Sequence, residues 1–266
     1  MKVNTAIVLC GGLGTRLRSV VSDLPKSMAD IQGTPFLEHL LRYWIDQGIQ
    51  RFILCVGYKA DAIISYFGNL YEDAEILYSS EKVALGTGGA LLKAKNKFNL
   101  VDPFILINGD TFFAVNLASL NNFAIKNNAD WCFSLFQSKE SSRYLPIMIN
   151  DDGSLILNSQ EIKERQLLES KEITNLPDYF EIEGRLHTCN GGVYWIKPKK
   201  LDYFLDEKFK NCSLENELIP LAIKSRQHLY GLVFNELFID IGIPEDYIRA
   251  KNIDFYIKKL HKKDQP

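Results

Sequence analysis

The first part of the chain combines residue types that suit the binding of a polyanion. Three glycines, Gly11, Gly12 and Gly14, follow an apolar run that is typical of a buried strand. Because glycine has no side chain, the backbone N–H groups of such a loop can approach phosphate oxygens closely. Arg16 adds a planar guanidinium group and Lys26 a compact ammonium group, and both bind phosphate. The stretch predicts a phosphate site, with an ordinary glycine turn as the alternative when it is considered alone.

Two acidic residues far apart in the sequence are candidate metal ligands. Asp110 and Asp240 each follow a run of apolar residues that predicts a strand. Two carboxylates that meet at strand ends suit Mg²⁺, a hard ion that keeps several waters and bridges phosphate oxygens. For either residue, a role as a turn-forming aspartate is the alternative.

A glutamate precedes a second glycine-rich turn and has the chemistry to select a base. Guanine presents two adjacent donors, which one carboxylate such as that of Glu81 can accept together, whereas uracil and thymine suit an amide better. Glu81 therefore favours guanine, and an exposed glutamate without a ligand is the alternative. Gly86, Thr87 and Gly88 are expected to line the same pocket, the glycines for close approach and the threonine through its hydroxyl.

The composition excludes several other classes of protein. With 266 residues, 46% of them hydrophobic, the chain can bury a substantial core. The 31 basic and 33 acidic residues give a net charge of -2, so no general attraction to nucleic acid or to an anionic membrane is expected. The five scattered cysteines predict reduced, mostly buried thiols. We find neither a signal-type segment nor a stretch of membrane-spanning length, which favours a soluble, cytoplasmic protein.

The first half of the chain alternates predicted strands with predicted helices. This βαβ rhythm predicts a mainly parallel sheet with helices on both faces, in which ligands lie beyond the carboxyl ends of the strands. Arg16 and Asp110 both fall at such ends. Strands are expected at Thr5–Cys10, Arg51–Gly57, Ala74–Tyr78 and Phe104–Ile107, and helices at 36–45, 60–67 and 86–97.

The second half is less regular but still belongs to a single domain that spans residues 1–266. A charged segment at about 159–187 is interpreted as an inserted flap or arm, which could pair subunits in a homo-oligomer or close over substrate. The remaining expected elements are a helix at 117–125, strands at 131–136 and 146–149 with a turn at 151–153, a turn at 190–192 that feeds a strand to 196, a helix at 214–223, and a strand at 238–242 before a helix start at Pro244.

Five of these segments together resemble the sugar-1-phosphate nucleotidylyltransferases. The resemblance rests on residues 11–35, Leu85–Ala90, Asn108–Asp110, Asn190–Tyr194 and Asp240–Pro244, in that order along the chain. It implies a Rossmann-like, mainly parallel mixed sheet of the nucleotide-diphospho-sugar transferase (GT-A-like) architecture. Within the family, the segment 108–113 most resembles guanylyltransferases of D-glycero-D-manno-heptose 1-phosphate, followed by those of mannose 1-phosphate.

The resemblance implies that a sugar 1-phosphate attacks the α-phosphorus of a nucleoside triphosphate, giving a nucleotide-sugar and pyrophosphate. Because the second pKa of a phosphate monoester is about 6, the nucleophile needs no general base at neutral pH, and the four scattered histidines offer no evident triad. The reaction needs positioning, cations and a metal instead. The implied catalytic residues are Arg16, at the triphosphate, and Lys26, at the transferring or attacking phosphate.

The resemblance also implies where each substrate binds. Asp110 and Asp240 are the implied ligands of Mg²⁺. The nucleotide, expected to be GTP, is assigned to Leu9, Gly11, Gly12, Gly14, Thr15, Glu81, Gly86, Thr87, Gly88 and Asn108. The sugar is assigned to Asn190, Gly191, Glu215 and Lys163, of which Glu215 could instead be a favourable acid in the first turn of a helix.

Three classes of function stay open from the sequence. The leading hypothesis is a Mg²⁺-dependent guanylyltransferase, with uridylyl or thymidylyl transfer as the variant within the family. A metal-dependent glycosyltransferase is the second, and the loop with Arg16 and Lys26 disfavours it. The third is an inactive regulator that binds nucleotide-sugars, which is suggested by Leu145, where relatives commonly have glycine, and by the lack of a clear Glu-Lys pair near Lys163.

Overall fold

The described part of the chain alternates strands and helices. The computed structural model describes residues 2–12, 24–138, 144, 147–156, 187–242 and 244–253. The strands are β1 (Thr5–Leu9), β2 (Asp30–Ile31), β3 (Thr34–Pro35), β4 (Arg51–Val56), β5 (Leu70–Tyr71), β6 (Ala74–Ser80), β7 (Phe104–Asn108), β8 (Thr111–Phe113), β9 (Trp131–Ser138), β10 (Met148–Ile149), β11 (Leu155–Ile156), β12 (His187–Ile196), β13 (Leu229–Val233) and β14 (Phe238–Asp240). The helices are α1 (Phe36–Asp46), α2 (Ala60–Phe67), α3 (Gly86–Lys97), α4 (Leu117–Lys126), α6 (Ile219–Lys224) and α7 (Pro244–Ala250), with 3₁₀ turns η2 (Lys26–Met28), η3 (Pro198–Phe204) and η4 (Glu207–Phe209) and a π-helical turn η5 (Leu214–Leu218).

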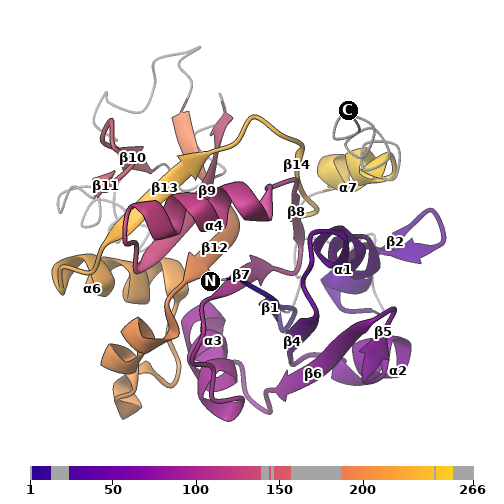
Figure 1. Ribbon diagram of the computed structural model, residues 1–266. Helices are drawn as coiled ribbons and strands as arrows, with labels where there is room; N and C mark the ends of the chain where they lie inside the picture. Colours follow the sequence, from indigo (N-terminus) through magenta and orange to yellow (C-terminus); the bar gives the residue numbers. More distant parts are fainter. Residues whose placement is uncertain are drawn as a thin grey trace, which may run out of the picture.

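The central sheet has eight strands in the order β13-β9-β12-β7-β1-β4-β6-β5 (Figure 1). Its middle strands β7, β1, β4 and β6 are parallel to one another, and β13 is parallel to β9. Strand β12 runs antiparallel between β7 and β9, and β5 is an antiparallel edge strand. This arrangement confirms the predicted mixed, mainly parallel sheet. It also brings the carboxyl ends of β1, β4, β6 and β7 to one edge.

Two hydrophobic cores cover the two faces of the sheet. Because neighbouring side chains of a strand point to opposite faces, Val8 of β1 joins one core and Ile7 the other. The first core packs α1, α2 and α4 against the sheet, and the second packs α3, η5 and α6 against it (Figure 1). Helix α3, which carries the second glycine-rich turn, therefore lies on the same face as η5. All five cysteines are buried and unpaired, as expected for reduced thiols.

The expected turn at Asn190–Gly192 is instead part of the ten-residue strand β12. The register between β12 and β9 shifts between Asn190 and Tyr194, so the glycines form an irregularity within the strand. A side chain at Gly191 would overlap the ring of Phe113, and Gly192 has a positive φ of 72°. The two glycines are needed for close packing against β7 and β8, and a sequence pattern does not separate that need from a turn.

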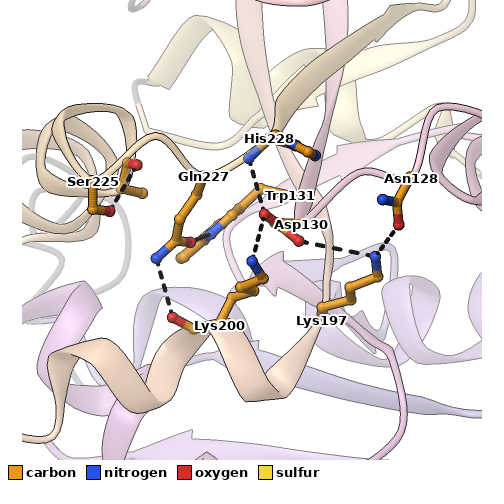
Figure 2. A network of polar contacts seen from close by, with 9 residues as sticks. Asn128, Asp130, Trp131, Lys197, Lys200, Ser225, Gln227 and His228 are labelled. Carbon is orange, nitrogen blue, oxygen red and sulfur yellow. Dashed lines mark hydrogen bonds and ion pairs between the residues drawn. The ribbon is translucent and has the colours of Figure 1, made fainter.

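A buried polar network holds the end of the sheet that lies opposite the carboxyl ends of β1 and β7. Asp130, just before β9, has a side chain that is 4% exposed, and it accepts from Lys200 Nζ at 3.1 Å and from the His228 backbone N–H at 2.9 Å (Figure 2). Lys197 lies 3.9 Å from the same carboxylate and donates to Asn128 at 2.8 Å. The network ties the starts of β9 and β13 to the end of β12. It stabilises the sheet away from the candidate site.

The other predicted elements agree with the structure wherever it describes them. The expected helix at 214–223 is divided into η5 and α6, and the predicted turn at 151–153 joins β10 to β11. Among the described residues, no helix is both long and apolar enough to cross a bilayer. The inserted segment at 159–187 lies outside the described residues except for His187, the first residue of β12.

Candidate active site

A lysine and two aspartates meet beyond the carboxyl end of β7. Lys26 Nζ lies 2.6 Å from Asp110 Oδ2 and 3.7 Å from Asp240 Oδ1. The lysine side chain is only 13% exposed, while the aspartate side chains are 39% and 28% exposed. The three residues predicted to handle phosphate and metal are therefore brought together, although they are far apart in the sequence.

The local structure explains how these three side chains converge. Strand β14 pairs antiparallel with β8, which places Asp240 opposite Thr111, next to Asp110. The backbone N–H of Ile241 donates to the backbone carbonyl of Asp110 at 3.0 Å, which closes this pairing. Lys26 begins the 3₁₀ turn η2 immediately after Pro25, whose φ of -57° suits the restricted proline ring. Both acids and the lysine thus stand on defined backbone.

The electrostatics of the site favour an additional cation. Burial raises the pKa of Asp240, and the neighbouring charge of Asp110 raises it further, while Lys26 and the Gly242 N–H oppose this shift. Two carboxylates that repel each other, with a single ammonium group nearby, are stabilised in their charged form when a divalent ion binds. Because both acids are partly exposed, phosphate oxygens and water can complete the coordination of such an ion. The donor set therefore fits the predicted metal ligands Asp110 and Asp240.

Glu81 lies at the same edge of the sheet, directly after β6. Its Oε2 accepts the Leu85 N–H at 3.0 Å, which fixes the turn that leads into α3. A Cβ built on Gly11 would lie 3.6 Å from Glu81 Oε1, so the carboxylate faces the first glycine loop. Burial raises the pKa of Glu81, although the Leu85 N–H and Lys93 act in the opposite direction. The glutamate predicted to read the base thus adjoins the predicted phosphate loop.

Asn108 and the β12 residues lie on the other side of the site. Asn108 ends β7 opposite Leu9 of β1, and its buried Oδ1 has no hydrogen-bond partner among the described residues. A Cβ built on Gly192 would lie 2.8 Å from Asn108 Nδ2, so Asn108 packs against the irregular part of β12. Asn190 and Gly191, predicted to bind the sugar, precede that position. The structure therefore places these two predicted sugar residues near the end of β7.

The second glycine-rich turn has a packing role that the sequence did not reveal. Cys212 accepts the N–H groups of Gly88 and Gly89 at 2.9 and 3.2 Å and donates its own N–H to Leu85 at 3.0 Å. A Cβ on Gly86 would overlap the Cys212 carbonyl, and one on Gly88 would lie 2.8 Å from Cys212 Sγ. Gly86 and Gly88 are thus needed for the contact between α3 and the segment before η5, and their contact with a base stays a prediction.

Substitution of Gly86 tests this packing role. Gly86→Ala is expected to lower the free energy of unfolding by about 2–4 kcal/mol, because φ is +69° and the new Cβ would overlap the Cys212 carbonyl. Gly33→Ala is the matched control, since Gly33 also has a positive φ, +88°, but open space at its Cβ position. The control is expected to lose about 1 kcal/mol. Equal losses in chemical denaturation would contradict the packing role.

Some of the predicted residues lie outside the described part of the chain, namely Gly14, Thr15, Arg16 and Lys163, together with Leu145. Sequence reasoning also assigned no role to Tyr194 or Cys212, which the structure places in contact with predicted site residues. Both residues stand among apolar residues in the sequence, so the sequence pattern gives no signal that separates them from ordinary core residues.

The fold and the site together define the class of the protein. The chain belongs to the nucleotidyl transferase family, whose model matches residues 5–255. This membership confirms the family that the sequence motifs predicted, and it identifies the protein as an enzyme of the nucleotidyltransferase class.

Individual members of the family are similar to the chain over nearly its whole length. The chain is 39% identical over 254 residues to the D-glycero-alpha-D-manno-heptose 1-phosphate guanylyltransferase of Aneurinibacillus thermoaerophilus, covering 95% of this chain and 99% of the relative. It is 37% identical to the Campylobacter jejuni enzyme of the same name, covering 91% and 96%. The crystal structure of HddC from Yersinia pseudotuberculosis complexed with GMP-PN superposes with a TM-score of 0.73 at 31% identity, covering 94% and 99%.

Proposed function

We propose that the protein transfers GMP from GTP to D-glycero-α-D-manno-heptose 1-phosphate, forming a GDP-sugar and pyrophosphate. The observation that carries the chemistry is the position of Lys26, 2.6 Å from Asp110 and 3.7 Å from Asp240, beyond the carboxyl end of β7. Support for guanine and heptose comes from the relatives at 39% and 37% identity and from Glu81. Mannose 1-phosphate is the second sugar to consider.

The proposed step needs charge control more than proton transfer. A phosphate oxygen of the sugar forms a bond to the α-phosphorus of GTP, while the bond from that phosphorus to the bridging oxygen of pyrophosphate breaks. The nucleophile is largely deprotonated at neutral pH, since its second pKa is about 6. Lys26 is proposed to neutralise charge on the phosphate being transferred, and Arg16 to hold the leaving pyrophosphate.

We assign Mg²⁺ to Asp110 and Asp240. When bound, the ion would supply positive charge that reduces the repulsion between the phosphates of the two substrates. The aspartates would fix its position through β8 and β14, which pair directly. Lys26 would remain beside the acids and turn its ammonium group toward phosphate.

The remaining residues are proposed to bind the two substrates on either side of this centre. The nucleotide side comprises Leu9, Gly11, Gly12, Gly14, Thr15, Glu81, Gly86, Thr87, Gly88 and Asn108. The sugar side comprises Asn190, Gly191, Glu215 and Lys163. The buried, unpaired cysteines support a reducing compartment, and we therefore propose a cytoplasmic enzyme.

A substrate panel tests the proposal. Pyrophosphate release is measured with GTP, UTP, dTTP and ATP, each with heptose, mannose and glucose 1-phosphates. The highest kcat/KM is expected for GTP with heptose 1-phosphate. A preference for UTP or dTTP would overturn the assignment of the base, while a preference for mannose 1-phosphate would change only the sugar. Sugar transfer from a GDP-sugar without pyrophosphate release would indicate a glycosyltransferase, and binding without turnover would indicate a regulator.

Glu81 is expected to make base selection depend on pH. Because the pKa of Glu81 is raised, it takes up a proton at higher pH than an ordinary glutamate, and the neutral acid cannot accept both donors of guanine. The KM for GTP should therefore rise as the pH falls. Glu81→Gln should lower kcat/KM for GTP about tenfold and abolish this pH dependence.

Two controls keep this test specific. The KM for UTP, measured over the same pH range, corrects for protonation of the triphosphate itself. Glu75→Gln removes an exposed glutamate that pairs with Arg51, and it should leave the pH profile unchanged. An unaltered profile in Glu81→Gln would show that Glu81 does not contact the base.

A further inference from the structure

Polar contacts lie between the start of α3 and the sugar side of the site. The Leu214 N–H donates to Thr87 Oγ1 at 2.8 Å, and Thr87 Oγ1 donates to Glu215 Oε2 at 2.9 Å. The charge of Glu215 also acts on the hydroxyl of Tyr194, which accepts from Asn190 Nδ2 at 2.7 Å. These contacts lie between residues predicted to bind the nucleotide and residues predicted to bind the sugar.

Tyr194 lies beside Asn190 and is inaccessible to substrate. Its side chain is fully buried, and its ring packs edge-on against Phe133 at 5.2 Å between centroids. A buried tyrosine hydroxyl needs a polar partner, which Asn190 supplies here. Burial raises the pKa of Tyr194, and the charge of Glu215 raises it further, so the hydroxyl stays protonated and available as a donor.

The hydrogen bonds of the Asn190 amide leave it one orientation. A backbone N–H can only donate, so the Gly192 N–H, at 3.1 Å, requires the Oδ1 of Asn190 to face it. The Nδ2 of Asn190 then faces the Tyr194 oxygen, to which it donates at 2.7 Å. The buried Tyr194 hydroxyl thereby holds the nitrogen side of the amide.

We propose that Tyr194 is a positioning residue that holds the Asn190 amide toward the sugar 1-phosphate. This inference rests on the proposed function, and it adds a residue that acts through Asn190 without touching substrate. With the amide fixed, the second Nδ2 hydrogen and the second Oδ1 lone pair of Asn190 point in defined directions toward the substrate's hydroxyl groups.

Removal of one hydroxyl provides the test. Tyr194→Phe is expected to raise the KM for the sugar 1-phosphate about tenfold and to leave the KM for GTP nearly unchanged. Tyr43→Phe is the matched control, because Tyr43 is also buried and donates to the Val115 carbonyl at 3.2 Å, away from α3 and β12. The control is expected to lose comparable thermal stability without a change in either KM. Equal changes in both KM values for Tyr194→Phe would indicate a structural role only and overturn the proposal.

A double-mutant cycle with Asn190→Ala shows whether Tyr194 acts through Asn190. If it does, the double variant has the same KM for the sugar as Asn190→Ala alone. Additive increases would overturn the proposal. If Tyr194→Phe fails to fold, Asn190→Asp is used instead, because it keeps the shape of the side chain but cannot donate to Tyr194. An unchanged KM for the sugar 1-phosphate in Asn190→Asp would overturn the proposal. If the wild-type enzyme releases no pyrophosphate from GTP and sugar 1-phosphate, the proposed function is refuted. Failure of the proposed function can therefore be distinguished from failure of the positioning role.

Discussion

Lys26→Ala is expected to lower kcat by about a hundredfold to a thousandfold at saturating substrates, while the fold is retained. The side chain is 13% exposed and lies beside both acids of the site, and under the proposed function its charge neutralises phosphate charge during transfer. Lys26→Arg should recover only part of the rate, since a planar guanidinium group does not reproduce the compact ammonium group. Pyrophosphate release under saturating GTP and sugar 1-phosphate measures the effect.

The surface lysine Lys210 provides the control for this substitution. It is 70% exposed and pairs with Glu207, and Lys210→Ala should retain normal turnover. Thermal unfolding with Mg²⁺ present checks the fold, because loss of Lys26 leaves the repulsion between Asp110 and Asp240 uncompensated. Near-normal kcat for a folded Lys26→Ala enzyme would refute a catalytic role of this lysine.

Asp110→Asn and Asp240→Asn are expected to raise the Mg²⁺ concentration for half-maximal activity at least about tenfold, with a large fall in kcat. Each variant removes one charged oxygen donor from the proposed metal site. In the wild-type enzyme, the Mg²⁺ requirement should also increase as the pH falls. The pKa of Asp240 is raised, so protons compete with the metal at higher pH than for an ordinary aspartate. Mg²⁺ titrations at several pH values measure both effects.

A substitution at an exposed aspartate is the control that distinguishes loss of metal binding from a general effect of removing a negative charge. Asp152 accepts two hydrogen bonds from Ser154 in the turn between β10 and β11, so Asp152→Asn should leave the Mg²⁺ requirement unchanged. If Asp110→Asn also had the wild-type requirement, direct ligation by Asp110 would be excluded.

The main architecture and the position of Asp110 could be predicted because both depend on local patterns. Apolar runs predicted β1, β4, β6 and β7, and the helical segments between them favoured a parallel sheet. Parallel strands share one carboxyl edge, so a polar residue that follows such a run is expected there. That reasoning placed Asp110 at this edge without knowledge of any long-range contact, while Arg16, expected at the same edge, lies outside the described residues.

The long-range pairings could not be predicted in the same way. The pairing of β14 with β8 brings Asp240 to Asp110, and although the apolar runs before them made both acids candidate metal ligands, no local pattern specifies this pairing. The packing of Gly86 against Cys212 and the hydrogen bond of Asn190 to Tyr194 depend on three-dimensional fit. Two adjacent glycines within β12 were read as a turn, because the ring of Phe113 that excludes a side chain there is distant in sequence.

Identification of the products formed from GTP, Mg²⁺ and D-glycero-α-D-manno-heptose 1-phosphate tests the central claim most directly. We predict equal amounts of the GDP-sugar and pyrophosphate, observed together by ³¹P NMR, and a strongly reduced yield for Lys26→Ala. Hydrolysis of GTP to GDP and phosphate without formation of a GDP-sugar would contradict the claim that Lys26, Asp110 and Asp240 form a nucleotidyl-transfer centre.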